Sequence, residues 1–131
     1  MKKDIQIPKV EQVYVAVVHE YNEIYNTQDW NAYIINDKDV ELDMLLIVSK
    51  GYSQDQETST MRHKLEKLPP KSYAKIELLQ DDVLALNNEF KVTFFEGNQL
   101  FDKTYLFRKN SINEKALQTI PLINKKGVLA K

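Results

Sequence analysis

The sequence predicts a mainly all-β protein, an antiparallel two-layer β-sandwich with a short helix and an extended tail toward its C-terminal end. About seven short runs rich in β-branched and aromatic residues recur along the chain, and turn-forming residues separate them. With 131 residues, 43% of them hydrophobic, the chain has enough apolar side chains for one core. We expect a single domain over residues 1–131, with its core at about 10–108 and its helix and tail at 111–131.

The first strand is expected from Val13 to Tyr21. Four of the six residues from Val13 to Val18 are valines, and β-branched side chains fit a pleated surface. The apolar residues between Val10 and Tyr25 also fall at helical spacing, so a helix remains the alternative. We favour the strand because Val15 and Ala16 would lie on the polar face of that helix.

Two strands follow on either side of a polar turn. Trp30 to Ile35 predicts the second strand, and we expect Trp30 to be buried in the core. The turn at 36–39 consists of Asn, Asp and Lys residues, and Leu42 to Ser49 predicts the third strand. Leu42, Met44, Leu46 and Val48 would lie on one face and Leu45 and Ile47 on the other, which predicts a central strand covered on both faces.

The middle of the chain contains one open assignment and one firm break. After a polar loop at 53–57, the segment from Thr58 to Leu68 fits either a helix or a strand. Pro69 and Pro70 end it, since neither has a backbone donor. A strand is expected from Tyr73 to Leu79, with Ala74, Ile76 and Leu78 on one side.

The most distinct signal is a β-hairpin, and a short helix is expected after it. Phe90 to Phe95 and Leu100 to Phe107 are aromatic and β-branched runs, and Gly97 with Asn98 between them suits a tight turn. Ser111 and Glu114 have the spacing of a capping box, which predicts a helix over 112–118. The residues from 122 onward are expected to lie extended across the body.

Two resemblances add to this interpretation. The proline turn before a strand and the later hairpin resemble immunoglobulin-like or fibronectin-like sandwiches over residues 10–108, although no cysteine pair is present. The runs 29–36, 59–65 and 86–115 are similar to a family of small uncharacterised proteins from Bacteroidetes-type bacteria. Some members are labelled phenylalanyl-tRNA synthetase alpha subunit. The glycine-rich ATP-binding motif of such an enzyme has no counterpart among Gly51, Gly97 and Gly127, so the resemblance implies an independent small protein.

Composition excludes several classes of site. The chain has no cysteine, which excludes disulfides, thiolate metal sites and a cysteine nucleophile. His19 and His63 are the only histidines and are interpreted as surface or packing residues. No motif for a nucleotide or a catalytic serine is present, so we expect no cofactor. No apolar run approaches the ~20 residues that cross a membrane, and we expect a cytoplasmic protein.

Two clusters of charged residues are candidates for binding. Asp37, Asp39, Glu41 and Asp43 alternate, and in an extended segment their carboxylates would gather on one face that suits a hard cation such as Ca²⁺. The alternative is a solvated hairpin tip. The second cluster is basic with one aromatic ring, and on a common face it would bind phosphates and stack on a base. Its members are Arg62, His63, Lys64, Lys67, Lys71, Tyr73 and Lys75.

The leading functional hypothesis is a non-catalytic module that binds an unknown protein partner, because the chain has a sufficient core and no catalytic constellation. RNA or tRNA association through residues 62–75 is the second hypothesis. An enzyme whose carboxylates come from separate strands is the third. The sequence predicts neither the partner nor the oligomeric state.

Overall fold

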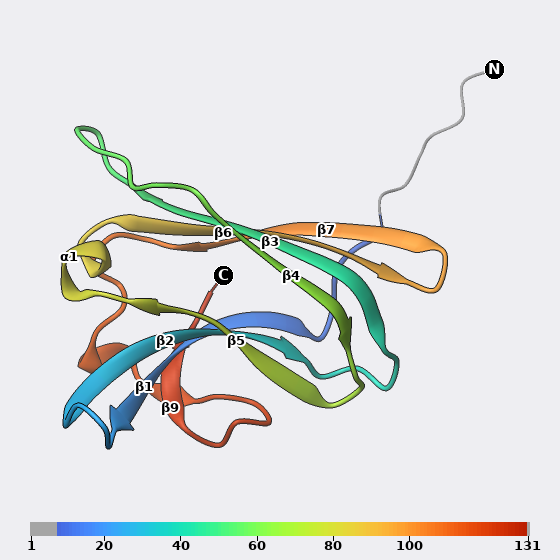
Figure 1. Ribbon diagram of the computed structural model, residues 1–131, viewed down its shortest axis with the longest axis horizontal. Coiled ribbons are helices and arrows are strands. Elements are labelled where there is room, and N and C mark those ends of the chain that lie inside the picture. Colours follow the sequence, from blue (N-terminus) through green and yellow to red (C-terminus); the bar gives the residue numbers. More distant parts are fainter. Residues whose placement is uncertain (1–7, 131) are drawn as a thin grey trace.

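The computed structural model describes residues 8–130 and contains two antiparallel sheets packed face to face (Figure 1), which confirms the all-β sandwich. We call them sheet I and sheet II. In sheet I the strand order is β5 (Ser72–Leu79), β2 (Thr27–Asn36), β1 (Val13–Asn22), β9 (Lys126–Leu129) and β8 (Gln118–Thr119). In sheet II the order is β4 (Met61–Leu68), β3 (Leu42–Tyr52), β6 (Asn87–Glu96) and β7 (Gln99–Phe107). The helices are α1 (Asp81–Leu84) and the 3₁₀ turn η1 (Glu114–Ala116).

The segment predicted as either a strand or a helix is the strand β1. Val13, Val15 and Val17 face the core between the sheets, and each is at most 2% exposed. Ala16 and Val18 point to the other face and are also fully buried, in a second apolar cluster. Burial on both faces explains why the sequence pattern was ambiguous, since a strand without a polar face loses its two-residue alternation.

Strand β3 is central in sheet II, but the expectation that both of its faces are covered is wrong. Leu42 and Leu45 are both buried on the inner face, although three residues apart, because the ladder to β6 shifts between Asp43 and Leu46. Met44 takes a φ of 51° within this bulge and is 67% exposed. The bulge keeps the leucines inward and turns the methionine to solvent.

The segment from Thr58 to Leu68, which fitted two structures, contains the strand β4, and the Pro69–Pro70 turn leads into β5. The expected alternation in β5 fails near its end. Glu77 pairs with Ala32 and Lys75 with Tyr33, so Ile76 is an extra residue in a second bulge. After this bulge Leu79 is buried and Leu78 is 46% exposed, so Leu78 does not share a side with Ala74 and Ile76.

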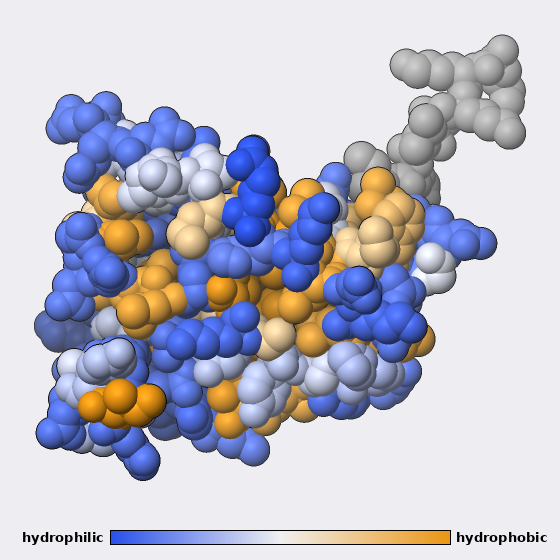
Figure 2. Space-filling model, viewed as in Figure 1, coloured by the Kyte–Doolittle hydropathy of each residue, from blue (hydrophilic) through white to orange (hydrophobic). Residues whose placement is uncertain are grey.

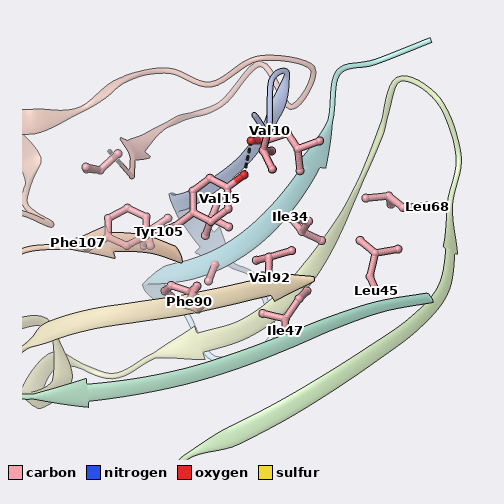
Figure 3. Packing of buried hydrophobic residues seen from close by; sticks show 14 of the residues in the cluster. Val10, Val15, Ile34, Leu45, Ile47, Leu68, Phe90, Val92, Tyr105 and Phe107 are labelled. Atoms are coloured by element: carbon pink, nitrogen blue, oxygen red, sulfur yellow. Dashed lines mark hydrogen bonds between the residues drawn. The ribbon is translucent and has the colours of Figure 1, made fainter. Parts of the chain in front are cut away.

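The predicted hairpin is confirmed as β6 and β7. Glu96 pairs with Gln99 across a two-residue turn, where Gly97 has the φ of 60° that a tight turn requires. Figure 3 shows Phe90, Val92, Tyr105 and Phe107 of this hairpin pointing toward sheet I. The Tyr105 hydroxyl donates a hydrogen bond to the Val13 carbonyl at 2.5 Å and so joins the sheets inside the core.

The C-terminal part contains a shorter helix than predicted, and the tail after it joins sheet I as two strands. The helix is the single turn η1, capped by the Asn113 side chain, which accepts from the Lys115 amide at 2.9 Å. The predicted capping role of Ser111 is wrong, since its hydroxyl donates to the Arg108 carbonyl. Residues 117–130 then cross the outer face of sheet I and add β8 and β9 to it. We call this segment the C-terminal strap.

The strap is held by apolar contact and by close backbone approach. Ile120 and Ile123 are 0% and 8% exposed and pack on Ala16, Val18 and Ile35 of sheet I. At Gly127 of β9 an added Cβ would lie 2.5 Å from the carbonyl oxygen of Val17. Glycine therefore lets the strap reach pairing distance of β1.

We expect Trp30→Ala to lower the free energy of unfolding by about 3–5 kcal/mol, the usual cost of truncating a large core aromatic. Trp30 is 8% exposed and stacks on His19, with ring centroids 4.1 Å apart. Denaturant titration followed by circular dichroism measures the change. A fluorescence maximum of the native protein at the wavelength of free tryptophan in water would contradict the burial on which this prediction depends.

We expect Gly127→Ala to cost about 1–3 kcal/mol, because the new methyl group would force β9 away from β1. Faster hydrogen exchange at the Val17 and Val128 amides, which face each other across the β1–β9 pair, would show that the strap has loosened. The control is Gly97→Asn, since asparagine tolerates positive φ and an added Cβ there meets nothing within 4 Å. Equal destabilisation by both variants would argue against close packing as the cause.

Candidate functional site

One side of the sandwich is open, because β5 and β4 are the unpaired edge strands of sheets I and II and lie on the same side. Leu65, Ala74 and Ile76 on these strands pack against the core yet remain only partly buried. Met61 at the start of β4 is 47% exposed. Figure 2 is viewed from this side and shows apolar side chains between the two sheets. We call this region the open side.

A groove of about 440 Å³ lies at one end of the open side, between β3, β4, β5 and α1. Leu79, Val83 and Phe90 contribute apolar surface to it, while Ser49 and Glu77 contribute polar groups. Its lining also includes Lys50, Gly51, Thr58, Ser59, Met61, Leu78, Gln80 and Asn88. This mixture of apolar walls with a few convergent polar groups is typical of a binding site.

Three polar side chains, each from a different strand, converge beside this groove, and two of them contact one carboxylate oxygen of the third. The Ser49 hydroxyl donates to Glu77 Oε1 at 2.6 Å, and His63 Nε2 lies 3.0 Å from the same oxygen. The Glu77 side chain is 13% exposed. In a nucleophilic triad the histidine lies between serine and acid, whereas here the acid lies between the other two. The arrangement ties β5 of sheet I to β3 and β4 of sheet II.

Sequence reasoning missed this cluster, although one signal was present. Ser49 continues the inward series of Leu45 and Ile47, so it is a polar residue at a core position of β3. Such a residue needs a buried partner. The partner, Glu77, faces inward only because of the bulge at Ile76, which no local pattern indicated.

The basic stretch that suggested RNA binding does not form one face. Arg62, Lys64 and Lys67 lie on the outer face of sheet II, beside Val48, Leu46 and Asp43 in the β3–β4 register. His63 points inward to Glu77. The others are elsewhere: Lys71 lies in the turn before β5, and Tyr73 and Lys75 follow on that strand in sheet I, beside Ile35 and Tyr33 of β2. A nucleic acid on one side of the molecule would therefore meet only part of the stretch.

The acidic residues proposed for a cation are distributed among lysines. Lys71 Nζ lies 3.1 Å from Asp37 Oδ1 and 3.9 Å from Asp39 Oδ1. Glu41 faces Lys67 at 3.6 Å, and Asp43 is within β3. Among residues 8–130, no group of three or more histidine, aspartate or glutamate side chains is placed to hold a metal ion.

A polar network on the outer face of sheet I holds the strap. Glu20 Oε1 accepts from Tyr33 at 2.6 Å and from Asn31 at 3.1 Å, and Glu20 Oε2 accepts from Lys125 of the strap at 2.8 Å. Burial raises the pKa of Glu20, but hydrogen bonds from Lys125, Tyr33 and Asn31 outweigh it and leave the pKa below its ordinary value. Burial and the neighbouring Glu20 raise the pKa of Tyr33.

Comparison of the chain with protein-family models, curated proteins and solved structures gives no match. The similarity to a Bacteroidetes-type family and its synthetase label thus stays a prediction. Within the part of the chain that the structure describes, no helix is long and apolar enough to cross a membrane. The cytoplasmic location also stays a prediction.

The Glu20 network predicts a loss of stability in acid. Because the folded-state pKa of Glu20 lies below its ordinary value, the carboxylate adds stability above that value, and this is lost as pH falls through the folded-state pKa. The difference in unfolding free energy between wild type and Glu20→Gln should be largest near neutral pH and shrink in acid. Denaturant titrations across pH measure it. Exposed Glu11→Gln is the control, and a difference that stays constant with pH would contradict the prediction.

Proposed function

We propose that this protein is a non-catalytic binding module that takes an extended segment of a protein partner along its open side. The observation that carries this proposal is that both sheets end there in unpaired strands over partly exposed core residues. Unpaired strand edges present free backbone donors and acceptors, which a partner strand can pair with. The groove beside β5 would receive the partner's alternate side chains.

The other strand edges are less suited to pairing. Strap strands β9 and β8 extend sheet I beyond β1, and the edge strand on that side, β8, has only two residues to offer to a partner. Exposed charges discourage strand pairing, and they lie at the centre of the β7 edge, at Asp102 and Lys103, and along the β4 edge, at Arg62, Lys64 and Lys67. On β5, by contrast, Tyr73 and Leu78 are exposed at 45% and 46%.

The division of strands between the sheets supports an immunoglobulin-like classification. Strands β1, β2 and β5 belong to one sheet, and β3, β4, β6 and β7 to the other. In immunoglobulin-like domains the strands A, B and E and the strands C, C′, F and G divide in the same way. The strap strands β8 and β9 are an addition to that pattern. Domains of this architecture serve many unrelated functions, so the open side rather than the fold carries the proposal.

The proposal can be tested by selecting peptides from a displayed library with the wild-type protein. The affinity of the selected peptides is then compared between the wild type and a variant in which both open-side strands carry an added charge. Met61→Lys/Leu78→Lys places a charge at one exposed position on each edge strand. The matched control, Phe95→Lys/Leu100→Lys, alters two exposed positions on β6 and β7 of sheet II.

We expect the wild type to select peptides with alternating apolar residues. Fluorescence polarisation should show affinity at least ~10-fold weaker for the open-side variant and little changed for the control. Bound peptide should slow hydrogen exchange of the β5 amides. Failure to select peptides, or equal affinity for both variants, would overturn strand addition at the open side.

A further inference from the structure

Glu77 lies in the open-side groove with one carboxylate oxygen that this chain does not use. Its Oε1 accepts from the Ser49 hydroxyl at 2.6 Å and lies 3.0 Å from His63 Nε2. Its Oε2 has no hydrogen-bond partner among residues 8–130. Oε2 is not sealed from solvent, because Asn31 Oδ1 is the only buried side-chain nitrogen or oxygen without a partner in that range. The carboxylate lines the groove, so Oε2 is an acceptor open to a ligand there.

The charge of this carboxylate has no lysine or arginine beside it in the described part of the chain. The ion-pair partner of Glu77 is His63, which is charged only when it is protonated. Lys50 also lines the groove, but its Nζ turns to Glu57 at 3.4 Å. The Glu77 side chain is 13% exposed. A carboxylate that is largely removed from water is stabilised by a cation next to it.

The walls around the carboxylate are apolar. Leu79, Val83 and Phe90 line the groove from β5, α1 and β6. The basic residues next to His63 on β4, Arg62 and Lys64, alternate to the outer face of sheet II and are not part of this lining. A side chain with an alkyl stem and a cationic end matches such walls and such a carboxylate.

An antiparallel strand added to β5 would bring one of its side chains to this carboxylate. Directly opposite residues of an antiparallel pair point to the same side of the sheet, with Cβ atoms about 4.5–5.5 Å apart. Glu77 points inward from the edge strand β5 to Ser49 of the other sheet. The partner residue opposite Glu77 would therefore point into the groove as well. The partner residues two positions before and after it would face the apolar side chains of Leu79 and Ile76.

The single open oxygen favours lysine over arginine. Arginine recognises a carboxylate best through two parallel hydrogen bonds, one to each oxygen. Ser49 and His63 already occupy Glu77 Oε1, so a guanidinium group would find only half of that arrangement. An ammonium group is a compact charge that needs only one oxygen.

We propose that the partner segment carries a lysine opposite Glu77, with apolar residues two positions before and after it. This inference rests on the proposed strand addition and specifies the partner that β5 selects. The lysine Nζ donates to Glu77 Oε2, its stem lies against the apolar walls of the groove, and the flanking apolar side chains cover the partly exposed core of the open side.

Selection from a displayed heptapeptide library gives the first measurement. We expect the wild type to enrich lysine at one position, with apolar residues two positions before and after it. Glu77→Gln keeps the size of the side chain and an acceptor but removes the charge, and it should lose this enrichment. Glu66→Gln is the matched control, because it removes an exposed carboxylate from β4 and should leave the enrichment unchanged.

Synthetic copies of a selected peptide, labelled with fluorescein, give the size of the effect. Norleucine in place of the lysine keeps most of the stem without the charge. Fluorescence polarisation should show about 10-fold weaker binding of the norleucine peptide to the wild type, since a hydrogen bond to a charged group is lost. Glu77→Gln should bind both peptides with similar affinity. Arginine in place of the lysine should also weaken binding to the wild type.

The outcomes separate this inference from the proposed function. Peptides selected without lysine enrichment, equal binding of the lysine and norleucine peptides, or a lysine preference retained in Glu77→Gln would overturn the lysine and leave strand addition standing. Tighter binding of arginine would overturn the assignment to one oxygen. A library that yields no peptide would overturn both proposals. Circular dichroism checks folding, and if Glu77→Gln is unfolded, the two peptides compared on the wild type decide alone.

Discussion

The burial of β1 on both faces is the constraint on which the rest of this structure depends. Its inward valines form the core with sheet II, and its outward residues Ala16 and Val18 need a separate cover. The strap supplies that cover with Ile120 and Ile123 and pairs β9 with β1. Because each buried aliphatic side chain contributes about 1.5–3 kcal/mol, neither side of β1 is dispensable in a domain of this size.

This constraint makes the two sides of the sandwich different. On the β1 side, residues 117–130 extend sheet I and cover its outer face. On the opposite side, no further strand pairs with β4 or β5 in the described part of the chain, and the sheets are linked there by Ser49, His63 and Glu77. These three side chains connect the two sheets by hydrogen bonds without a continuous layer of apolar side chains between β4 and β5. The open side is thus compatible with a stable fold.

Most strands could be predicted because β-branched and aromatic runs are local signals, and the hairpin of β6 and β7 had its turn residues in sequence as well. The two bulges could not be predicted. At Met44 and Ile76 an extra residue reverses the alternation, and the energy that favours it comes from burial of Leu45 and Leu79 in a core assembled from distant strands. Local pattern also misplaced the helix cap, since Asn113 rather than Ser111 met the backbone donor.

The candidate sites also could not be predicted from local sequence. Charged residues near one another in sequence alternate between faces or pair with opposite charges, so neither the acidic nor the basic run remains a cluster in space. The groups that do converge come from separate strands, such as Ser49 with Glu77 and Glu20 with Lys125. Their convergence is a product of topology, which composition and spacing do not encode.

The distance along the chain between β1 and the strap has a consequence for how the protein reaches its native state. Glu20 and Lys125 are 105 residues apart, and the Tyr105–Val13 bond joins residues 92 apart. Contacts of such separation are slow to form, since the chain loses loop entropy before burial compensates for it. During synthesis the outer face of sheet I remains bare until the ribosome has released the strap. For that interval the nascent chain exposes Ala16, Val18 and Ile35, and transiently exposed apolar surface of this kind is prone to aggregation.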